Sequence, residues 1–392
     1  MSELLSRFDD LRRREPTRPL IHLPAAGSTL SAAALWDAHQ PLADRLAACG
    51  VSAGRLVISA LGNSPASVEL LLASRALRAA VMPVDGCATP TEIRQLAERF
   101  RATAIALPDG VVRAEWTARE YADAAVLKVT SGSTGEAKAT LTTEAQLIAD
   151  ATHIVDAMDI RPSDVQIAAI PVSHSYGLGN LMLPLLLQGT AFVLRESFIP
   201  HQLPADAARF GARVFPGVPF MFEYFLANAP ASGWPPTLRR LISAGAPLAP
   251  ATVREFHARF GVKIHSFYGS SETGGIAFDD GDDPGDAGTV GRLLRGVAVT
   301  LRIAECGLRI EETDCGLRTA EDADGGLRIA EDLEAAEDRR STIINPRSAI
   351  DQSAITPHSA LRNPWVAFMS SATPCRAATP TANAAASSTA GF

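Results

Sequence analysis

Residues 126–138 read VLKVTSGSTGEAK, an apolar strand pattern that runs into a loop of hydroxyl residues, glycines and one lysine. Glycines let backbone N–H groups approach an anion, hydroxyls bind its oxygens and a lysine adds positive charge. We expect the loop to join the strand to a helix over residues 142–158. It is not the Walker pattern, because alanines flank Lys138. The predicted phosphate-binding residues are Thr130, Ser131, Gly132, Ser133, Thr134, Gly135 and Lys138. Taken alone, a turn of this composition is more often an ordinary loop than a nucleotide site. The other motifs of the chain therefore decide whether it is interpreted as a phosphate-binding loop.

On both sides of this loop, strand-like and helix-like runs alternate, which is typical of an α/β fold with a parallel sheet. The expected helices cover residues 31–48, 66–79, 91–100, 142–158 and 250–260. The expected strands cover residues 55–61, 80–84, 104–107, 126–130, 165–170, 191–194, 214–215, 241–243 and 263–267. The apolar stretch 178–194 is interrupted by Asn180, Pro184, Gln188 and Gly189, so it predicts a buried helix or a helix–strand unit and no membrane span.

The amino-acid composition limits the classes of binding partner and the kinds of site that are expected. The chain has 392 residues, 47% of them hydrophobic, and a net charge of −7, which argues against nucleic acid as the main partner. Five cysteines without CxxC spacing predict neither a disulfide framework nor a zinc site, and they fit a cytoplasmic protein. Only three lysines are present, Lys128, Lys138 and Lys263, so a reaction that needs an amine has few candidates.

Four further motifs follow the loop in order. They are Pro171–Gly177 (PVSHSYG), Ser243–Leu248 (SAGAPL), Phe267–Gly274 (FYGSSETG) and Gly288–Arg292 (GTVGR). Together with the loop they resemble the adenylate-forming superfamily, which comprises acyl-CoA synthetases, luciferases and the adenylation domains of peptide synthetases. The resemblance covers about residues 20–300. Within the loop, Ala137 and Ala139 replace a proline and a glycine that are usual in that family.

The resemblance implies a domain organisation. Residues 1–300 would form a large AMP-binding N-terminal domain of stacked αβα subdomains with parallel-rich sheets. Residues 301–340, an acidic segment with Leu-Arg repeats, would form short strands at most. Residues 341–392, rich in Ala, Ser, Thr, Pro and Arg, are expected to be disordered.

The resemblance also implies residue roles. Thr134, Lys138 and Glu272 would be catalytic, and Glu272 would also bind Mg²⁺, for which a carboxylate is chemically suited. His174 and Val218 would border the substrate acid. The residues around the nucleotide would be those of the loop together with Gly245, Ala246, Pro247, Tyr268, Gly269, Ser270 and Ser271.

The implied reaction is activation of a fatty or aromatic carboxylic acid by ATP and Mg²⁺ to an acyl-adenylate. A thioester would then form with coenzyme A or with the phosphopantetheine thiol of an acyl carrier protein. The alternative is a protein that binds ATP or acyl-adenylate without catalysis. Pyrophosphate exchange distinguishes the two hypotheses.

After Gly291 the resemblance stops. The family's Thr-Gly-Asp motif is absent, and no lysine follows Lys263, although the family has a catalytic lysine in a C-terminal domain. Three interpretations stay open: an out-of-frame or degenerate C-terminal third, a variant whose missing domain another chain supplies, or a binding protein that no longer catalyses. With the lysine and the ribose-binding aspartate missing, we expect slower adenylation than in a complete member of the family.

Overall fold

The strand that leads into the glycine-rich loop lies next to one edge of a six-stranded sheet. The computed structural model describes residues 2–130 and 137–299 and two short paired strands, β16 (Ala320–Glu321) and β17 (Leu327–Arg328). The six-stranded sheet has the order β6 (Gly110–Arg113), β5 (Ala104–Leu107), β3 (Leu56–Ser59), β4 (Ala80–Pro83), β7 (Ala124–Thr130) and β8 (Lys138–Thr143). Its four inner strands are parallel, and β6 and β8 are antiparallel edges.

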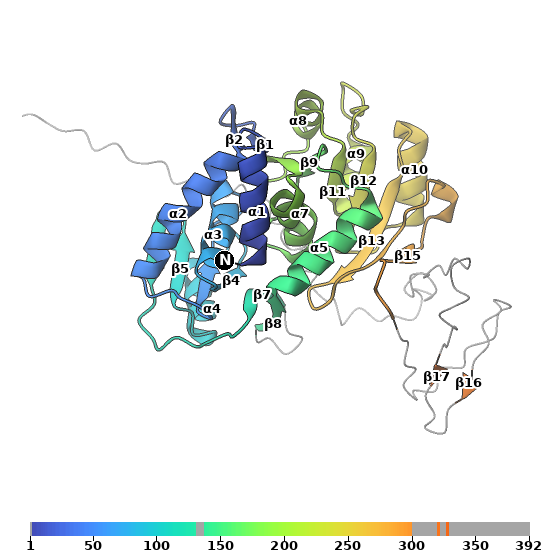
Figure 1. Ribbon diagram of the computed structural model, residues 1–392. Coiled ribbons are helices and arrows are strands. Elements are labelled where there is room, and N and C mark those ends of the chain that lie inside the picture. Colours follow the sequence, from blue (N-terminus) through green and yellow to red (C-terminus); the bar gives the residue numbers. More distant parts are fainter. Residues whose placement is uncertain (1, 131–136, 300–319, 322–326, 329–392) are drawn as a thin grey trace, which may run out of the picture. The chain divides into compact units, whose positions relative to one another are not determined.

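A second sheet has nine strands and is again parallel in its middle. Its order is β15 (Arg292–Leu293), β14 (Gly274–Phe278), β13 (Ile264–Ser270), β12 (Arg240–Ser243), β11 (Val214–Gly217), β9 (Val165–Ala168), β10 (Ala191–Leu194), β1 (Pro19–Leu23) and β2 (Ser28–Ser31). Strands β2, β14 and β15 pair antiparallel to their neighbours. The α/β class with parallel-rich sheets is thereby confirmed (Figure 1).

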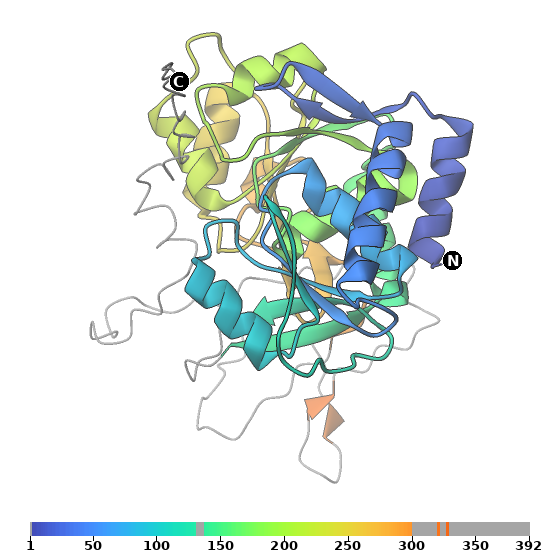
Figure 2. The same cartoon turned by 90° about the vertical axis from the view of Figure 1, so that its left-hand side faces the viewer.

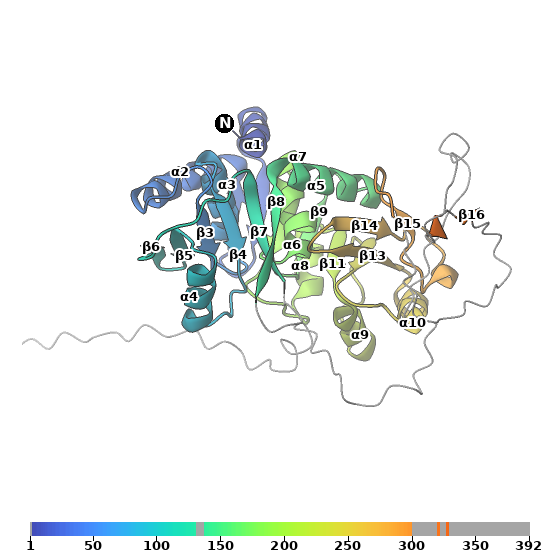
Figure 3. The same cartoon turned by 90° about the horizontal axis from the view of Figure 1, so that it is seen from below.

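Helices cover the strands and connect the sheets. They are α1 (Glu3–Arg14), α2 (Ala32–Ala48), α3 (Pro65–Ala76), α4 (Pro90–Arg99), α5 (Glu144–Met158), α6 (Ser175–Gly177), α7 (Leu183–Gln188), α8 (Leu203–Phe210), α9 (Pro219–Ala227) and α10 (Pro250–Phe260). A π-helical turn (Leu178–Met182) precedes α7, and a 3-10 turn (Pro284–Asp286) precedes β15. Helix α5 contacts β7 and β8 of one sheet and β14 of the other (Figure 3).

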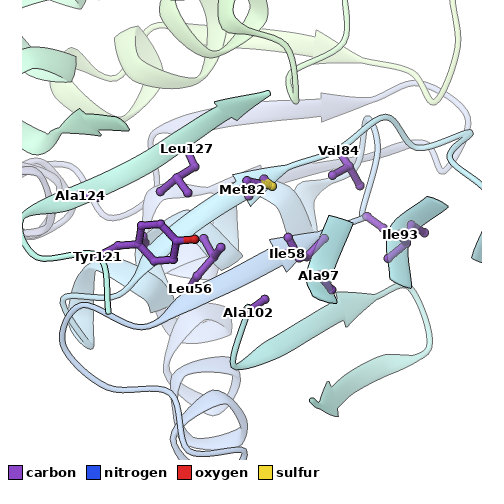
Figure 4. Packing of buried hydrophobic residues seen from close by; sticks show 12 residues of the cluster. Leu56, Ile58, Met82, Val84, Ile93, Ala97, Ala102, Tyr121, Ala124 and Leu127 are labelled. Atoms are coloured by element: carbon purple, nitrogen blue, oxygen red, sulfur yellow. The ribbon is translucent and has the colours of Figure 1, made fainter. Parts of the chain in front are cut away.

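Strand alternation decides which helix covers which face of the six-stranded sheet. Leu56 and Ile58 point to one face, where they pack with Met82, Leu127 and residues of α4 (Figure 4). Residues between them in sequence point to the other face, because side chains alternate along a strand. Helix α3 packs there against β3 and β4. Figure 2 shows α4 in cyan and the blue helices α2 and α3 on opposite sides of this sheet.

Most of the predicted elements are confirmed within a few residues. Ser31 caps α2 as expected, with its hydroxyl accepting a hydrogen bond from Ala34 N at 3.2 Å. The region after the loop is different. A strand, β8, precedes the helix, which begins only at Glu144 behind a capping box of Thr143 and Gln146. The loop therefore joins two antiparallel strands, and the prediction that it joins a strand to a helix is wrong.

Several predictions fall outside the described residues. These are residues 131–136 of the loop, nearly all of the expected Leu-Arg segment 301–340, and the whole of 341–392. The predicted domain boundaries stay predictions. In the part of the chain that the structure describes, none of the helices is long and apolar enough to cross a membrane.

A buried histidine in β13 makes stability depend on pH. The His265 ring is only 3% exposed, and its Nδ1–H donates to the carbonyl oxygen of Asp279 at 2.9 Å. Burial, with Arg240 3.5 Å from Nε2, lowers the pKa of His265 from 6.5 to about 4. The folded state therefore binds this proton less readily than the unfolded state, so the stabilisation is complete above pH 6.5 and is lost as pH falls towards 4.

We expect His265 to account for about 3 kcal/mol of lost unfolding free energy between pH 7 and pH 4. Urea unfolding measured at several pH values should show this slope in the unmodified protein, with a shallower slope in His265→Gln. Carboxylates titrate in the same pH range, so the contribution of His265 is the difference in slope between the unmodified protein and His265→Gln. The control is His257→Gln at a partly exposed position on α10, which removes a histidine and keeps the buried ring of His265. Equal slopes in all three proteins would contradict the assignment.

Candidate active site

Four neighbouring parallel strands bring four of the predicted motifs to one edge of the nine-stranded sheet. The carboxyl-terminal end of β13 carries Tyr268–Ser271, and the carboxyl ends of β12, β11 and β9 lead into Gly245–Pro247, Val218 and the segment 171–177. Ligands in α/β folds bind beyond the carboxyl ends of parallel strands. The motifs are far apart in sequence, but the parallel topology places them side by side.

Two of these strand ends meet at the turn expected to lie against adenine. Ala244 N donates to the carbonyl oxygen of Gly217 at 3.2 Å, which ties the end of β12 to the end of β11. Gly245 has φ of 84°, a left-handed conformation that favours glycine. A β-carbon at this position would lie 3.7 Å from Val218 Cγ1, so the turn and Val218 are neighbours.

The segment 171–177 is held to its surroundings by three hydrogen bonds. The hydroxyl of buried Tyr176 donates to the carbonyl oxygen of Ile242 at 3.3 Å, and Val172 N donates to Asn63 Oδ1 at 2.8 Å. Ser175 Oγ donates to Ser271 Oγ at 3.0 Å, which joins this segment directly to the motif around Glu272. The predicted acid-side and metal-side residues therefore belong to one connected site.

His174 lies at the start of α6 with its ring exposed to solvent. Tyr176 N donates to His174 Nδ1 at 3.4 Å, so the neutral ring carries its proton on Nε2. The surrounding protein nonetheless desolvates the imidazolium and lowers the pKa of His174. Asp85 opposes this decrease and Lys128 adds to it. Near neutral pH the ring is thus an uncharged hydrogen-bonding group that an incoming acid can reach.

Glu272 stands on a tight turn between β13 and β14. Ser270 Oγ accepts hydrogen bonds from the backbone N–H groups of Glu272 and Thr273, each at 3.2 Å, and so shapes the turn. The predicted nucleotide-binding Ser270 thereby has a clear local structural role. Tyr268, further back on β13, is 50% exposed, which leaves an aromatic face open to a planar ligand.

The surroundings of Glu272 fit a magnesium ion that is shared with a substrate. Its carboxylate is exposed, and among residues 2–130 and 137–299 no hydrogen bond or salt bridge engages it. The described residues also contain no cluster of three or more acidic, histidine or cysteine side chains that could hold a metal alone. Magnesium is commonly held by one or two carboxylates, with water and substrate phosphates completing its shell. The donor set present here is of that kind.

Helix α5 fixes the far side of the same turn. Asp150 Oδ1 accepts a hydrogen bond from Gly275 N at 2.8 Å. Burial raises the pKa of Asp150, while this hydrogen bond and Lys128 oppose the increase. Gly274, next to it, has φ of 78°, and a β-carbon there would lie 2.4 Å from the Asp150 carboxyl carbon. The turn that carries Glu272 therefore packs closely against Asp150.

The glycine-rich loop starts and ends on paired residues. Thr130 lies opposite Lys138 in the β7–β8 register, with Lys138 exposed, and Arg99 Nε donates to Ala137 O at 2.8 Å. The predicted residues Ser131, Gly132, Ser133, Thr134 and Gly135 lie outside the described residues. Thr134 as a catalytic residue therefore stays a prediction, whereas both anchors of the loop are placed.

Sequence reasoning missed two charged residues at this site, Lys128 and Asp150. Lys128 was one of only three lysines, but it lay in a strand pattern and received no role. Asp150 lay on an expected helix, where an acidic residue usually faces water. Burial lowers the pKa of Lys128, and the carboxylates of Asp150 and Glu272 oppose that decrease, so both carboxylates lie close enough to act on Lys128.

Comparison with known proteins finds a matching family profile and relatives that are acid–CoA ligases. A family profile described as AMP-binding enzyme matches residues 111–309. Sulfoacetate–CoA ligase of Cupriavidus necator is 29% identical over 314 residues, which cover 71% of this chain and 62% of the relative. Benzoate–CoA ligase of Thauera aromatica is 34% identical over 184 residues, or 46% of this chain and 34% of the relative. The chain thus spans less than two thirds of either protein.

Among solved structures, apo MatB of Rhodopseudomonas palustris superposes with a TM-score of 0.68 at 25% sequence identity. The superposition covers 79% of this chain and 68% of that one. The α/β architecture is therefore shared with this solved structure over most of the present chain.

Proposed function

The chain belongs to the AMP-binding enzyme family, and on that premise we propose that it activates a carboxylic acid with ATP. A carboxylate oxygen of the acid attacks the α-phosphorus, the bond to the β-phosphate oxygen breaks, and pyrophosphate leaves. The product is an acyl-adenylate, a mixed anhydride. A thiol sulfur then attacks its carbonyl carbon, a thioester forms and AMP is released.

The observation that carries the proposal is the Ser175–Ser271 hydrogen bond, which places the His174 segment against the Glu272 turn. A reaction between an acid and a nucleotide phosphate needs both reactants in contact, and positioning supplies much of the rate. The exposed ring of His174 and the side chain of Val218 would border the acid. Tyr268 and the turn at Gly245–Pro247 would hold the adenine.

The charged residues have distinct tasks in this reaction. Lys138 and the loop that it closes would hold the pyrophosphate group as it leaves. The Glu272 carboxylate would hold magnesium, which when bound offsets the negative charge of the phosphates. Ser270 and Asp150 keep the Glu272 turn in place through the hydrogen bonds described above.

The relatives guide the choice of substrates. Their names specify sulfoacetate and benzoate as acids and coenzyme A as the thiol partner. We therefore propose a small or aromatic carboxylate as the acid and coenzyme A as the acceptor, with fatty acids included in any screen. A carrier-protein thiol is the alternative acceptor, since either thiol performs the same attack.

Exchange of labelled pyrophosphate into ATP tests the proposal with the full chain. Benzoate, sulfoacetate and a series of fatty acids should be supplied one at a time with magnesium. Acid-dependent exchange supports activation. ATP binding by calorimetry without exchange for any acid would replace the proposal by that of a non-catalytic nucleotide-binding protein.

His174 gives a prediction on the acid. We expect His174→Ala to raise the KM for the acid about 10-fold or more, because an uncharged hydrogen-bonding group at the acid is lost. The KM for ATP should change little. His174→Asn, which keeps a donor and an acceptor, should recover part of the loss. An equal rise of both KM values would contradict an acid-side position for His174.

A further inference from the structure

Lys128 is a buried cation in the strand that leads to the loop. Its side chain is 6% exposed. Its neighbour Leu127 belongs to the cluster beneath α4 (Figure 4). Val129 packs against the same cluster. Because side chains alternate along a strand, Lys128 points to the other face of the sheet, where α5 packs on β7 and β8.

The ammonium group of Lys128 has no close partner of its own. Within residues 2–130 and 137–299 it forms neither a hydrogen bond nor a salt bridge. The other buried lysine differs, because Lys263 Nζ lies 2.9 Å from Asp279 Oδ2 and donates to the carbonyl oxygen of Gly281 at 2.7 Å. Burying most of a lysine without a bonded partner is costly. Lys128 Nζ is nevertheless not one of the unpaired side-chain atoms that the described residues enclose completely, so a ligand can reach it.

The register of β7 and β8 sets Lys128 on the same face as the two anchors of the loop. Lys128 pairs with Thr140, and Thr130 pairs with Lys138. Residues opposite each other in an antiparallel pair share a face, as do residues two apart on one strand. Lys128 is therefore about 7 Å along the strand from Thr130, where the predicted phosphate contacts begin.

The two nearby carboxylates interact with Lys128 through space and are not hydrogen-bonded to it. Asp150 is engaged with Gly275 N, and Glu272 stands exposed on its turn. A ligand between the loop anchors and Glu272 would be flanked by a cation on one side and a metal-binding carboxylate on the other. A polyphosphate chain that carries a magnesium ion has matching charges.

We propose that Lys128 is a phosphate-binding residue of the nucleotide site, whose ammonium group bonds to a phosphate oxygen of ATP. The inference rests on the proposed function and adds to it a fixed positive charge inside β7. Unlike exposed Lys138, this charge is held by packing before the nucleotide arrives, so its contact is preorganised.

Varying the charge of the ligand distinguishes a phosphate-binding role of Lys128 from a purely structural one. ATP without magnesium carries about two more negative charges than MgATP, so a fixed cation should favour free ATP more strongly. We expect Lys128→Met to weaken binding of ATP in EDTA about 10- to 100-fold and of MgATP by a smaller factor, both measured by calorimetry. Lys128→Arg, which keeps the charge, should recover most of the affinity.

Lys263→Met is the matched control, because it removes the other buried lysine, whose charge Asp279 already neutralises. It should leave the ratio of the two affinities unchanged. Equal weakening of ATP and MgATP by Lys128→Met would overturn the inference while leaving the proposed function intact. Absence of ATP binding by the unmodified chain in either condition would overturn both.

A measurement on the unmodified sequence covers the case in which Lys128→Met does not fold. Lysine labelled with ¹³C at Cε gives three signals, one for each lysine of the chain. Lys138→Arg identifies one of them, and the Lys128 and Lys263 signals are told apart by Lys263→Arg. ATP in EDTA should shift the Lys128 signal and leave that of Lys263 in place. An unmoved Lys128 signal at saturating ATP would overturn the inference.

Discussion

Glu272→Ala is expected to reduce acid-dependent pyrophosphate exchange about 100- to 1000-fold, the range found when one preorganised charge-stabilising group is removed from an active site. Its carboxylate is exposed and unengaged by the described residues, so no other described contact is lost with it. Thermal unfolding should therefore change little. The measurement is initial exchange rate against magnesium concentration, because weakened metal binding should also raise the concentration needed for half-maximal rate.

Glu255→Ala provides the matched control. Glu255 is an exposed glutamate on α10, away from the described site, and its loss should leave both the exchange rate and its magnesium dependence unchanged. Unchanged exchange in Glu272→Ala would mean that the turn between β13 and β14 does not hold the metal. Equal losses in both variants would point to a general charge effect.

Gly274→Ala should affect stability and activity together. The substitution places a β-carbon 2.4 Å from the Asp150 carboxyl group, in a backbone conformation with φ of 78°. The clash and the backbone strain should together lower the free energy of unfolding by about 2–4 kcal/mol. Displacement of Asp150 would also break the hydrogen bond that Gly275 N–H donates to its carboxylate, and that bond holds the Glu272 turn. Urea unfolding and exchange assays on the same preparation measure the two effects.

Gly261→Ala separates the effect of backbone strain from that of a steric clash with the new β-carbon. Gly261 ends α10 with φ of 71°, and nothing lies within 4 Å of a β-carbon built there. It should therefore lose only about 1 kcal/mol, the strain contribution, and keep its exchange activity. If Gly274→Ala loses no more stability than Gly261→Ala and keeps its activity, the Asp150 contact does not support the turn.

The sequence predicted the parallel framework because buried strands and amphipathic helices have local patterns. Val165–Ala168 and Arg240–Ser243 are short strands with mostly buried residues, and turn residues follow them closely. The motifs at their ends were also visible locally. Their mutual placement was implied only by the family resemblance, since strand order is a long-range property that one sequence does not display.

Strand β8 shows why the remainder was missed. Its residues KATLTT alternate weakly, so residues 138–141 gave no strand signal, and the helix was predicted to begin at residue 142, inside the last two residues of the strand. Pairing with β7 stabilises β8, and that contribution does not appear in its own sequence. Lys128 was missed for a related reason. Whether a lysine in a strand faces water or protein depends on what packs over it, here α5.

Oxygen-18 transfer tests the central claim most directly. An acid that supports exchange is labelled in its carboxylate and incubated with ATP, magnesium, coenzyme A and the full chain, and the AMP formed is analysed by mass spectrometry. If the carboxylate attacks the α-phosphorus, the bridging oxygen stays with phosphorus when the thiol displaces AMP. The expected result is AMP with one oxygen-18 atom and a thioester of the acid. Unlabelled AMP, or ADP as the nucleotide product, would contradict activation through an acyl-adenylate.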